Sequence, residues 1–195
     1  MPQLFLPFTP AGKATEQRAI QAKEMLGLGP YDSIDPFSVL ERVPARLLNA
    51  SVLNRCSEMN RRVLLESASK DWSGIGYGKI GADGEALILI NPNHHPHRQK
   101  VTLMEEILHV LFDHPKTELA VGYPNWKRPY DSKIEKEAYG VGAACIIPYR
   151  SLFRLVNDQH KAVAEISSEF AVSEEYCYFR IKDAGLYRVY QKHCR

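Results

Sequence analysis

The sequence predicts an α+β fold that is mainly helical and carries a small antiparallel sheet. Apolar residues recur at helical spacing in much of the chain, most clearly over residues 100–112. Two short apolar segments, 75–80 and 85–90, flank the turn dipeptide Asp83-Gly84, a pattern typical of a β-hairpin. A chain of 195 residues, 45% hydrophobic and 25% charged, is long enough for one sizeable core.

Capping residues and turn residues indicate where the first elements begin and end. Thr9 followed by Pro10 is typical of a helix start, and Gly27 is typical of a helix end. The elements predicted before the hairpin are a helix over about residues 10–26, a short helix over about 35–43 and an extended apolar segment at 46–52.

The second half of the chain is predicted to be helical apart from one long loop. Residues 115–129 contain three prolines and a glycine, which predicts a loop after the mostly buried helix at 100–112. A second helix is expected from Ser132 to just before Pro148, and its many small residues favour close approach to a neighbouring helix. Residues 161–186 have the pattern of a helix-turn-helix pair.

We expect one compact body with three parts. They are an N-terminal arm and helix (1–34), a central domain (35–160) and a C-terminal helix-turn-helix-like element (161–195) packed on the same core. The C-terminal element could be a DNA-reading module. However, its second helix would begin with Glu174-Glu175, and two carboxylates there would repel phosphates, which favours a structural role.

Charge and cysteine usage suggest neither a nucleic-acid nor a membrane partner. The formal net charge is +2, with basic residues dispersed along the chain. The four cysteines form no C-x-x-C pair, so a reducing compartment is the simpler expectation. The opening residues lack a basic leader and no apolar run is long enough to span a membrane, so we expect a cytoplasmic protein.

The helix at 100–112 carries the residues with the clearest chemical pattern. Glu105, Glu106, His109 and Asp113 share the narrow polar arc left by its apolar residues. In an H-E-x-x-H helix, side chains four residues apart can hold one metal ion, and the glutamate between them serves as a general base. Here the string is E-E-x-x-H. The alternative is the solvated face of an amphipathic helix, because a motif this short is common by chance.

Three segments, in order and at matching spacing, resemble the ImmA/IrrE family of zinc metallopeptidases. In that family a strand ending in I-N precedes an R-x-x-F-T-L-A-H-E-x-x-H helix. An E-x-x-A-N-x-F-A-A-x-L-L-M-P helix follows, and then closing F-x-V-S and R-L-x-x-L-G-L segments. The matching segments here are Ile90-Asn91-Pro92 with residues 98–111, residues 135–148, and residues 169–173 with 180–186. The resemblance extends from about Asp35 to Tyr187.

The resemblance implies a zincin-like peptidase, a hydrolase with a zinc cofactor, and it assigns roles to individual residues. Glu106 matches the catalytic glutamate, His109 the second metal ligand and Glu135 the third. The substrate it implies is a protein or peptide, such as a transcriptional repressor. Glu135 has a second interpretation, because Ser132-x-x-Glu135 also fits a capping box at the start of its helix.

Two positions depart from the family pattern. Glu105 stands where the first histidine ligand is expected, and Tyr139 stands where the family has asparagine. One histidine and two glutamates around a divalent ion sum to about zero charge, which makes the ion a weaker Lewis acid and shifts preference from zinc towards manganese. The chain is then a weakened peptidase, a peptidase with another metal, or a metal-free relative that binds a regulatory protein.

Four histidines flank this helix, and one of them could reach the metal from a loop: His94, His95, His97 and His114. Against this, His94, His95 and His97 fit a polar surface loop, and the helical wheel places His114 away from Glu105 and His109. An exposed strand of the hairpin could bind an extended peptide by strand pairing.

Overall fold

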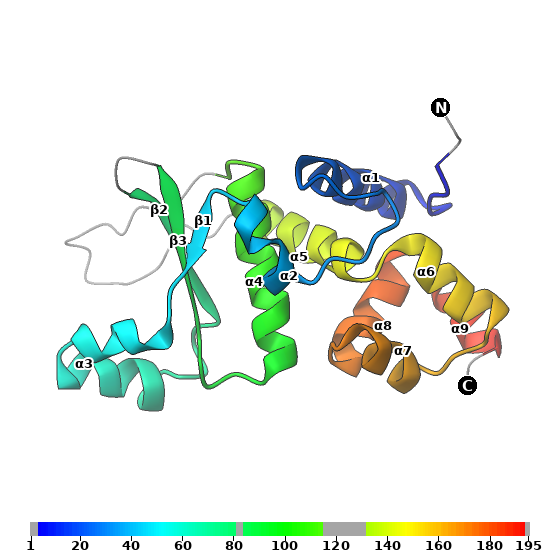
Figure 1. Cartoon of the computed structure of the whole chain (residues 1–195). Helices are drawn as coiled ribbons and strands as arrows, with labels where there is room; N and C mark the ends of the chain where they lie inside the picture. Colours follow the sequence, from blue (N-terminus) through cyan, green and yellow to red (C-terminus); the bar gives the residue numbers. More distant parts are fainter. Residues whose placement is uncertain (1–3, 81–83, 115–131, 194–195) are drawn as a thin grey trace.

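A computed structural model describes residues 4–80, 84–114 and 132–193, and within them the chain is mainly helical with one three-stranded sheet (Figure 1). The strands are β1 (Ala45–Leu47), β2 (Gly74–Ile80) and β3 (Glu85–Ile90), in the order β1-β3-β2. The predicted hairpin is confirmed, since β2 pairs antiparallel with β3. The loop predicted at 115–129 and Asp83 of the hairpin turn lie outside the described residues.

The prediction of a purely antiparallel sheet is wrong, because β1 pairs parallel with β3 and the sheet is mixed. A short helical segment, Ala50–Arg55, follows β1 where an extended chain was expected, and the Asn49 side chain accepts a hydrogen bond from the Ser51 amide at its start. A three-residue strand without an adjoining hairpin turn carries no sequence signal for its direction. Its pairing is decided by tertiary contacts.

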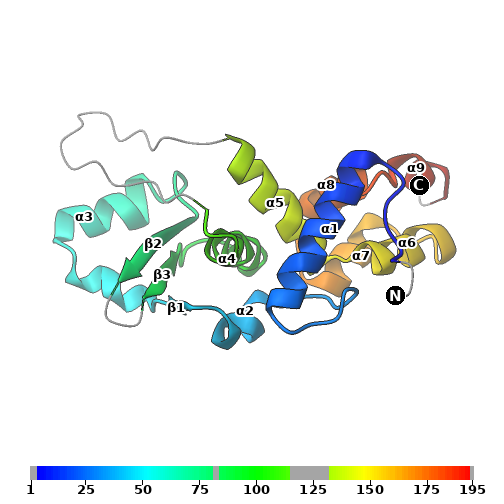
Figure 2. The same cartoon turned by 90° about the horizontal axis from the view of Figure 1, so that it is seen from above.

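Helix α4 (Pro96–Leu111) lies between the sheet and the other long helices (Figures 1 and 2). It contacts β2 and β3 on one side and α5 (Ser132–Ile146) on the other. Pro96 occupies its first turn, one turn before the predicted start, and five of its apolar residues are buried in the core: Val101, Leu103, Met104, Ile107 and Leu108. The prediction of a mostly buried helix is confirmed.

Helix α5 is surrounded by α1 (Pro10–Met25), α4 and α8 (Glu174–Asp183), and residues 140–146 are all buried. A Cβ atom added at Gly140 would lie 3.8 Å from Thr15 Cγ2, and one added at Gly142 would lie 3.6 Å from Met104 Cγ. These are ordinary van der Waals contacts. The small residues bring the neighbouring helices close while leaving room for a methyl group.

The C-terminal residues form the predicted helix pair, α7 (Val163–Phe170) and α8, joined by a turn in which Ala171 has a left-handed backbone (φ 50°). Phe170, Val172 and Ile181 are buried in the same core cluster as α1, α4 and α5. The three-part division of the chain stays a prediction.

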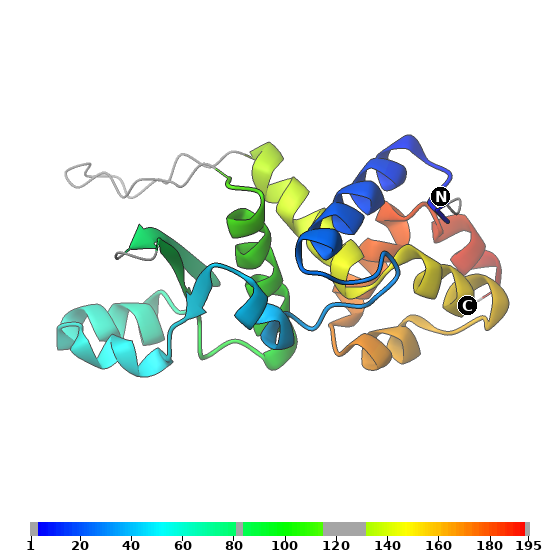
Figure 3. The same cartoon turned by 45° about the horizontal axis from the view of Figure 1, so that its top comes forward.

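The remaining helices complete the two ends of the molecule. They are α2 (Pro36–Val39), α3 (Glu58–Arg62), α6 (Tyr149–Phe153) and α9 (Tyr187–His193), with short 3-10 or π-helical segments at Leu40–Arg42, Val63–Ser67 and Arg154–Asp158. Figure 3 shows α3 at one end and α6, α7 and α9 at the other, with α4 and α5 between them. Among the described residues, no helix combines the length and apolar character needed to cross a membrane.

Candidate metal centre

His109 on α4 and Glu135 on α5 face each other across the contact between the two helices. His109 Nε2 lies 3.6 Å from Glu135 Oε2. A tetrahedral zinc ion bound to both atoms would hold them about 3.4 Å apart. Burial lowers the pKa of His109, opposed by the nearby Glu135 carboxylate, and the neutral imidazole is the form that binds a metal. The two side chains therefore fit a shared divalent cation.

Glu135 lies in the first turn of α5, three residues after Ser132, where the described part of the helix begins. The position of Glu135 opposite His109 agrees with the ligand interpretation.

Glu106 lies on the sheet side of α4, over the backbone of the edge strand β2. A Cβ atom added at Gly74 would lie 3.1 Å from Glu106 Oε1, and one added at Gly76 would collide with Glu106 Oε2. Gly74 and Gly76 are thus the residues that let a carboxylate lie against this strand. Sequence reasoning missed this relationship, although alternating glycines in a strand are a signal for close approach by another group.

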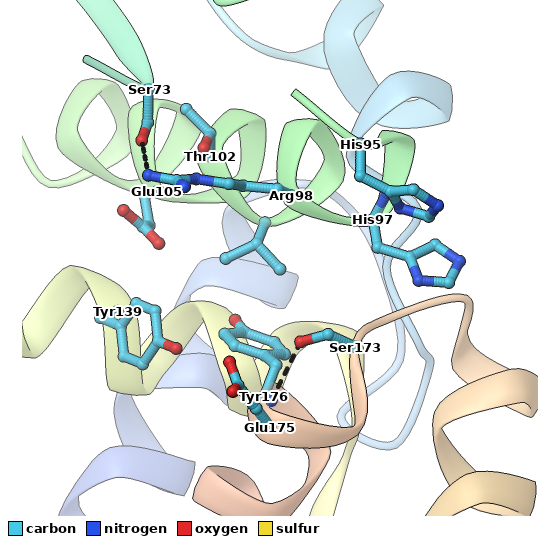
Figure 4. A pocket seen from close by; sticks show the side chains of 11 residues that line it. Ser73, His95, His97, Arg98, Thr102, Glu105, Tyr139, Ser173, Glu175 and Tyr176 are labelled. Carbon is cyan, nitrogen blue, oxygen red and sulfur yellow. Dashed lines mark hydrogen bonds between the residues drawn. The ribbon is translucent and has the colours of Figure 1, made fainter. Parts of the chain in front are cut away.

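Glu105 lines a pocket of about 510 Å³ between α4, α5 and the start of α8. Figure 4 shows its carboxylate on the α4 side of the pocket, with Tyr139 and Tyr176 on the opposite side. Burial, together with the nearby Glu106 and Glu135 carboxylates, raises the pKa of Glu105 to about 8, although Arg98 opposes the shift. A carboxyl with this pKa is largely protonated at neutral pH in the absence of a cation.

The structure therefore brings His109 and Glu135 together, while Glu106 lies over β2 and Glu105 lines the pocket. Within residues 4–80, 84–114 and 132–193, no group of three or more His, Cys, Asp or Glu side chains is close enough to hold a metal ion. Glu105 as a further ligand stays a prediction.

The two departures from the family pattern lie in the same pocket (Figure 4). Tyr139 packs edge-on against Tyr176, with ring centroids 5.2 Å apart, and against Phe179, with centroids 4.7 Å apart. The nearby Glu105 carboxylate adds to the effect of burial in raising the Tyr139 pKa. The residue that replaces the expected asparagine is thus part of an aromatic cluster beside Glu105.

The expectation that His114 lies away from His109 is wrong. Helix α4 ends at Leu111, and Asp113 adopts a left-handed backbone (φ 49°) that turns the chain back. His114 Nδ1 lies 3.0 Å from His109 Nδ1, and the His114 side chain is buried. A helical wheel cannot place a residue beyond the end of its helix, whereas an aspartate near that end, which tolerates a left-handed backbone, is a signal for such a turn.

The three upstream histidines lie at the other end of α4, away from His109. His95 is the N-cap residue of α4, and its Nδ1 accepts a hydrogen bond from the His97 amide 3.2 Å away. His94 lies beside Asn91, with 3.5 Å between His94 Nε2 and Asn91 Nδ2.

A histidine on a mostly buried helix, 3.6 Å from a carboxylate of the next helix, is a pair of side chains typical of metal sites in metallopeptidases. The family model Peptidase_M78, described as an IrrE N-terminal-like domain, matches residues 60–182, which is more than half of the chain. The chain belongs to this family, whose peptidases are generally zinc-dependent. A search of curated proteins finds no match.

Proposed function

We propose that this protein is a metal-dependent peptidase of the ImmA/IrrE type that cleaves a protein substrate such as a transcriptional repressor, with activity weakened by Glu105. The observation that carries the proposal is the approach of His109 Nε2 to Glu135 Oε2, 3.6 Å apart, in a chain of this family. The scattered cysteines, which form no C-x-x-C pair, support a cytoplasmic location as part of the same proposal.

His109 and Glu135 are the residues that would hold the cation, and Glu105 would complete the set through a change of its side-chain conformation. When bound, zinc or manganese supplies Lewis acidity that polarises the substrate carbonyl. A set of one neutral imidazole and two carboxylates cancels the charge of a divalent ion, so that Lewis acidity is reduced. Glu105 is therefore the residue that would weaken the site.

Glu106 would serve as the general base and then as the proton donor. Its carboxylate lies over Gly74 and Gly76 of β2, which is the edge strand of the sheet. A substrate segment paired with this edge would pass beside Glu106, which could take a proton from the attacking water and deliver it to the leaving amine. Proline substitutions in β2 should weaken peptide binding if strand pairing holds the substrate.

Metal content and proteolysis of protein purified without a histidine tag test the proposal. We expect one zinc or manganese ion per chain, and slow cleavage of a fluorescent casein probe that is lost in Glu106→Gln. Glu105→His should tighten zinc binding and raise the cleavage rate. If neither the wild type nor Glu105→His takes up metal at neutral pH or cleaves casein, the proposal that the protein is a peptidase is refuted.

The second candidate function is a metal-free relative that binds a regulatory protein. It is favoured by the position of Glu105, which lines the pocket opposite Tyr139. In that case a captured partner should bind equally well to the wild type and to His109→Ala. Loss of partner binding on removal of metal would exclude this alternative.

A further inference from the structure

His114 contacts His109 on the side of the ring opposite the proposed metal. His109 directs Nε2 towards Glu135 and Nδ1 towards His114, at 3.6 Å and 3.0 Å respectively. The two rings are nearly perpendicular, with an interplanar angle of 74°. The short distance between the two Nδ1 atoms is a hydrogen-bond distance, so one nitrogen must donate and the other accept.

The backbone and neighbouring side chains hold His114 in this place. Its amide donates to the His109 carbonyl at 3.0 Å, and its side chain is only 8% exposed. Arg18 of α1 contacts the Phe112 ring at 3.7 Å and pairs with Glu137 of α5 at 2.8 Å, which ties the end of α4 to the helix that carries Glu135. The contact between the imidazoles is therefore built into the packing.

We propose that His114 is a positioning residue that sets the tautomer of His109, because a single proton lies between their Nδ1 atoms and the two neutral rings must hold opposite tautomers. This inference rests on the proposed function where it concerns metal binding. Its account of the two imidazoles applies equally to the metal-free protein.

In the metal-free protein, His109 carries its proton on Nε2, facing the Glu135 carboxylate, and His114 Nδ1–H donates to His109 Nδ1. Metal binding needs a free lone pair on His109 Nε2. His109 then gives up the Nε2 proton and takes the proton shared between the Nδ1 atoms, while His114 gains one on Nε2. The pair holds two protons before and after, so His109 becomes a ligand without net proton release from the pair.

Imidazole nitrogen NMR of ¹⁵N-labelled protein tests this directly, with resonances assigned by His109→Gln and His114→Gln. Without metal we expect Nε2–H on His109 and Nδ1–H on His114, and zinc should exchange the two tautomers. Identical tautomers on both rings, or a His109 spectrum unchanged in His114→Phe, would overturn the inference.

Zinc affinity supplies the second readout. His114→Phe should weaken zinc binding by about 10–100-fold, the usual effect of losing a hydrogen-bond partner of a ligand. His114→Gln keeps an acceptor oxygen and should recover most of the affinity, and His193→Phe on the exposed end of α9 is the matched control. Equal affinity in the Phe, Gln and wild-type proteins would overturn the positioning role.

Failure of the proposed function gives a different result. A wild type that binds no zinc would refute the metallopeptidase. The NMR spectra of metal-free wild type and His114→Phe would still decide whether His114 sets the tautomer of His109.

Discussion

Two regions of the molecule hold charged side chains that are buried or partly buried, and they differ in how the charges are balanced. Between α1 and α8, Arg180 is fully buried and forms an ion pair with Glu16. Arg180 also donates to the Ile147 carbonyl at 3.0 Å, and Glu16 accepts from the Tyr149 amide at 2.9 Å. The Arg180 and Glu16 charges are thus paired with each other and have further hydrogen bonds, and the buried Lys23 nearby donates to the Ala144 carbonyl at 3.4 Å.

Around α4 and the start of α5, the described residues place three carboxylates near one another: Glu105, Glu106 and Glu135. Glu106 and Glu135 both raise the pKa of Glu105, and Arg98 opposes them. Arg98 is engaged with Ser73, to which it donates at 2.8 Å. A buried charge without a balancing charge is costly, and a protein avoids the cost by protonation or by binding a counter-ion. The first region therefore stabilises the fold, whereas the second is suited to a cation.

The largest expected effect on stability comes from breaking the ion pair between Arg180 and Glu16. Arg180→Met leaves the Glu16 carboxylate buried without its partner and should lower the free energy of unfolding by about 3–5 kcal/mol. Urea denaturation measures the loss, with Lys182→Met on the same helix as the control. A loss below about 1 kcal/mol would show that the Arg180 ion pair does not hold α1 and α8 together.

Around Glu105, a substitution that removes the acid should raise the free energy of unfolding instead of lowering it. Because the Glu105 pKa is raised from 4.5 to about 8, the folded chain keeps a proton that the unfolded chain loses. Stability therefore falls as pH rises from about 4.5 to about 8, and the penalty is fully present above that range. Glu105→Gln should remove this slope and raise the free energy of unfolding at pH 8 by on the order of 1–3 kcal/mol.

The measurement is urea denaturation in EDTA at several pH values. Glu175→Gln, an exposed residue that lines the same pocket, is the matched control. An unchanged pH slope in Glu105→Gln would mean that Glu105 is ionised in the fold and already balanced.

The close approach of Glu106 to β2 can be broken with one methyl group. Gly76→Ala places a Cβ atom against Glu106 Oε2 and should displace the carboxylate. We expect casein cleavage to be lost while the free energy of unfolding changes by less than about 1 kcal/mol, because the displaced atom is the end of a flexible side chain. Full cleavage by this variant would show that Glu106 does not act from its position over the strand.

The smallest effect concerns α5, where a methyl group has room. Gly140→Ala should raise the free energy of unfolding by roughly 0.5–1 kcal/mol, because alanine loses less backbone entropy than glycine in a helix. Thermal and urea unfolding measure the gain. Destabilisation would show that the contact with Thr15 is tighter than 3.8 Å implies.

Local patterns predicted much of the fold. Helix α1, the hairpin and the end of α5 lie within one or two residues of their expected bounds, since each depends on caps, turn residues or a following proline. The parallel pairing of β1 and the helices at 50–67 could not be predicted, because they depend on contacts distant in the sequence.

In the candidate site, too, some features could be predicted from the sequence and others could not. The resemblance assigned His109 and Glu135 as ligands of one metal ion, and the structure places the two side chains 3.6 Å apart. The position of Glu105 in the pocket and the contact of His114 with His109 were not predicted. Both depend on side-chain directions or on the turn after a helix, which sequence periodicity does not specify.

The central claim is that the acidic region holds a cation through His109 and Glu135. Calorimetric titration of untagged protein with zinc at neutral pH tests it most directly. The account predicts one zinc per chain in the wild type and loss of that binding in Glu135→Gln, with urea stability retained. A wild type that binds no zinc, or a Glu135→Gln variant that binds it equally well, would contradict the claim.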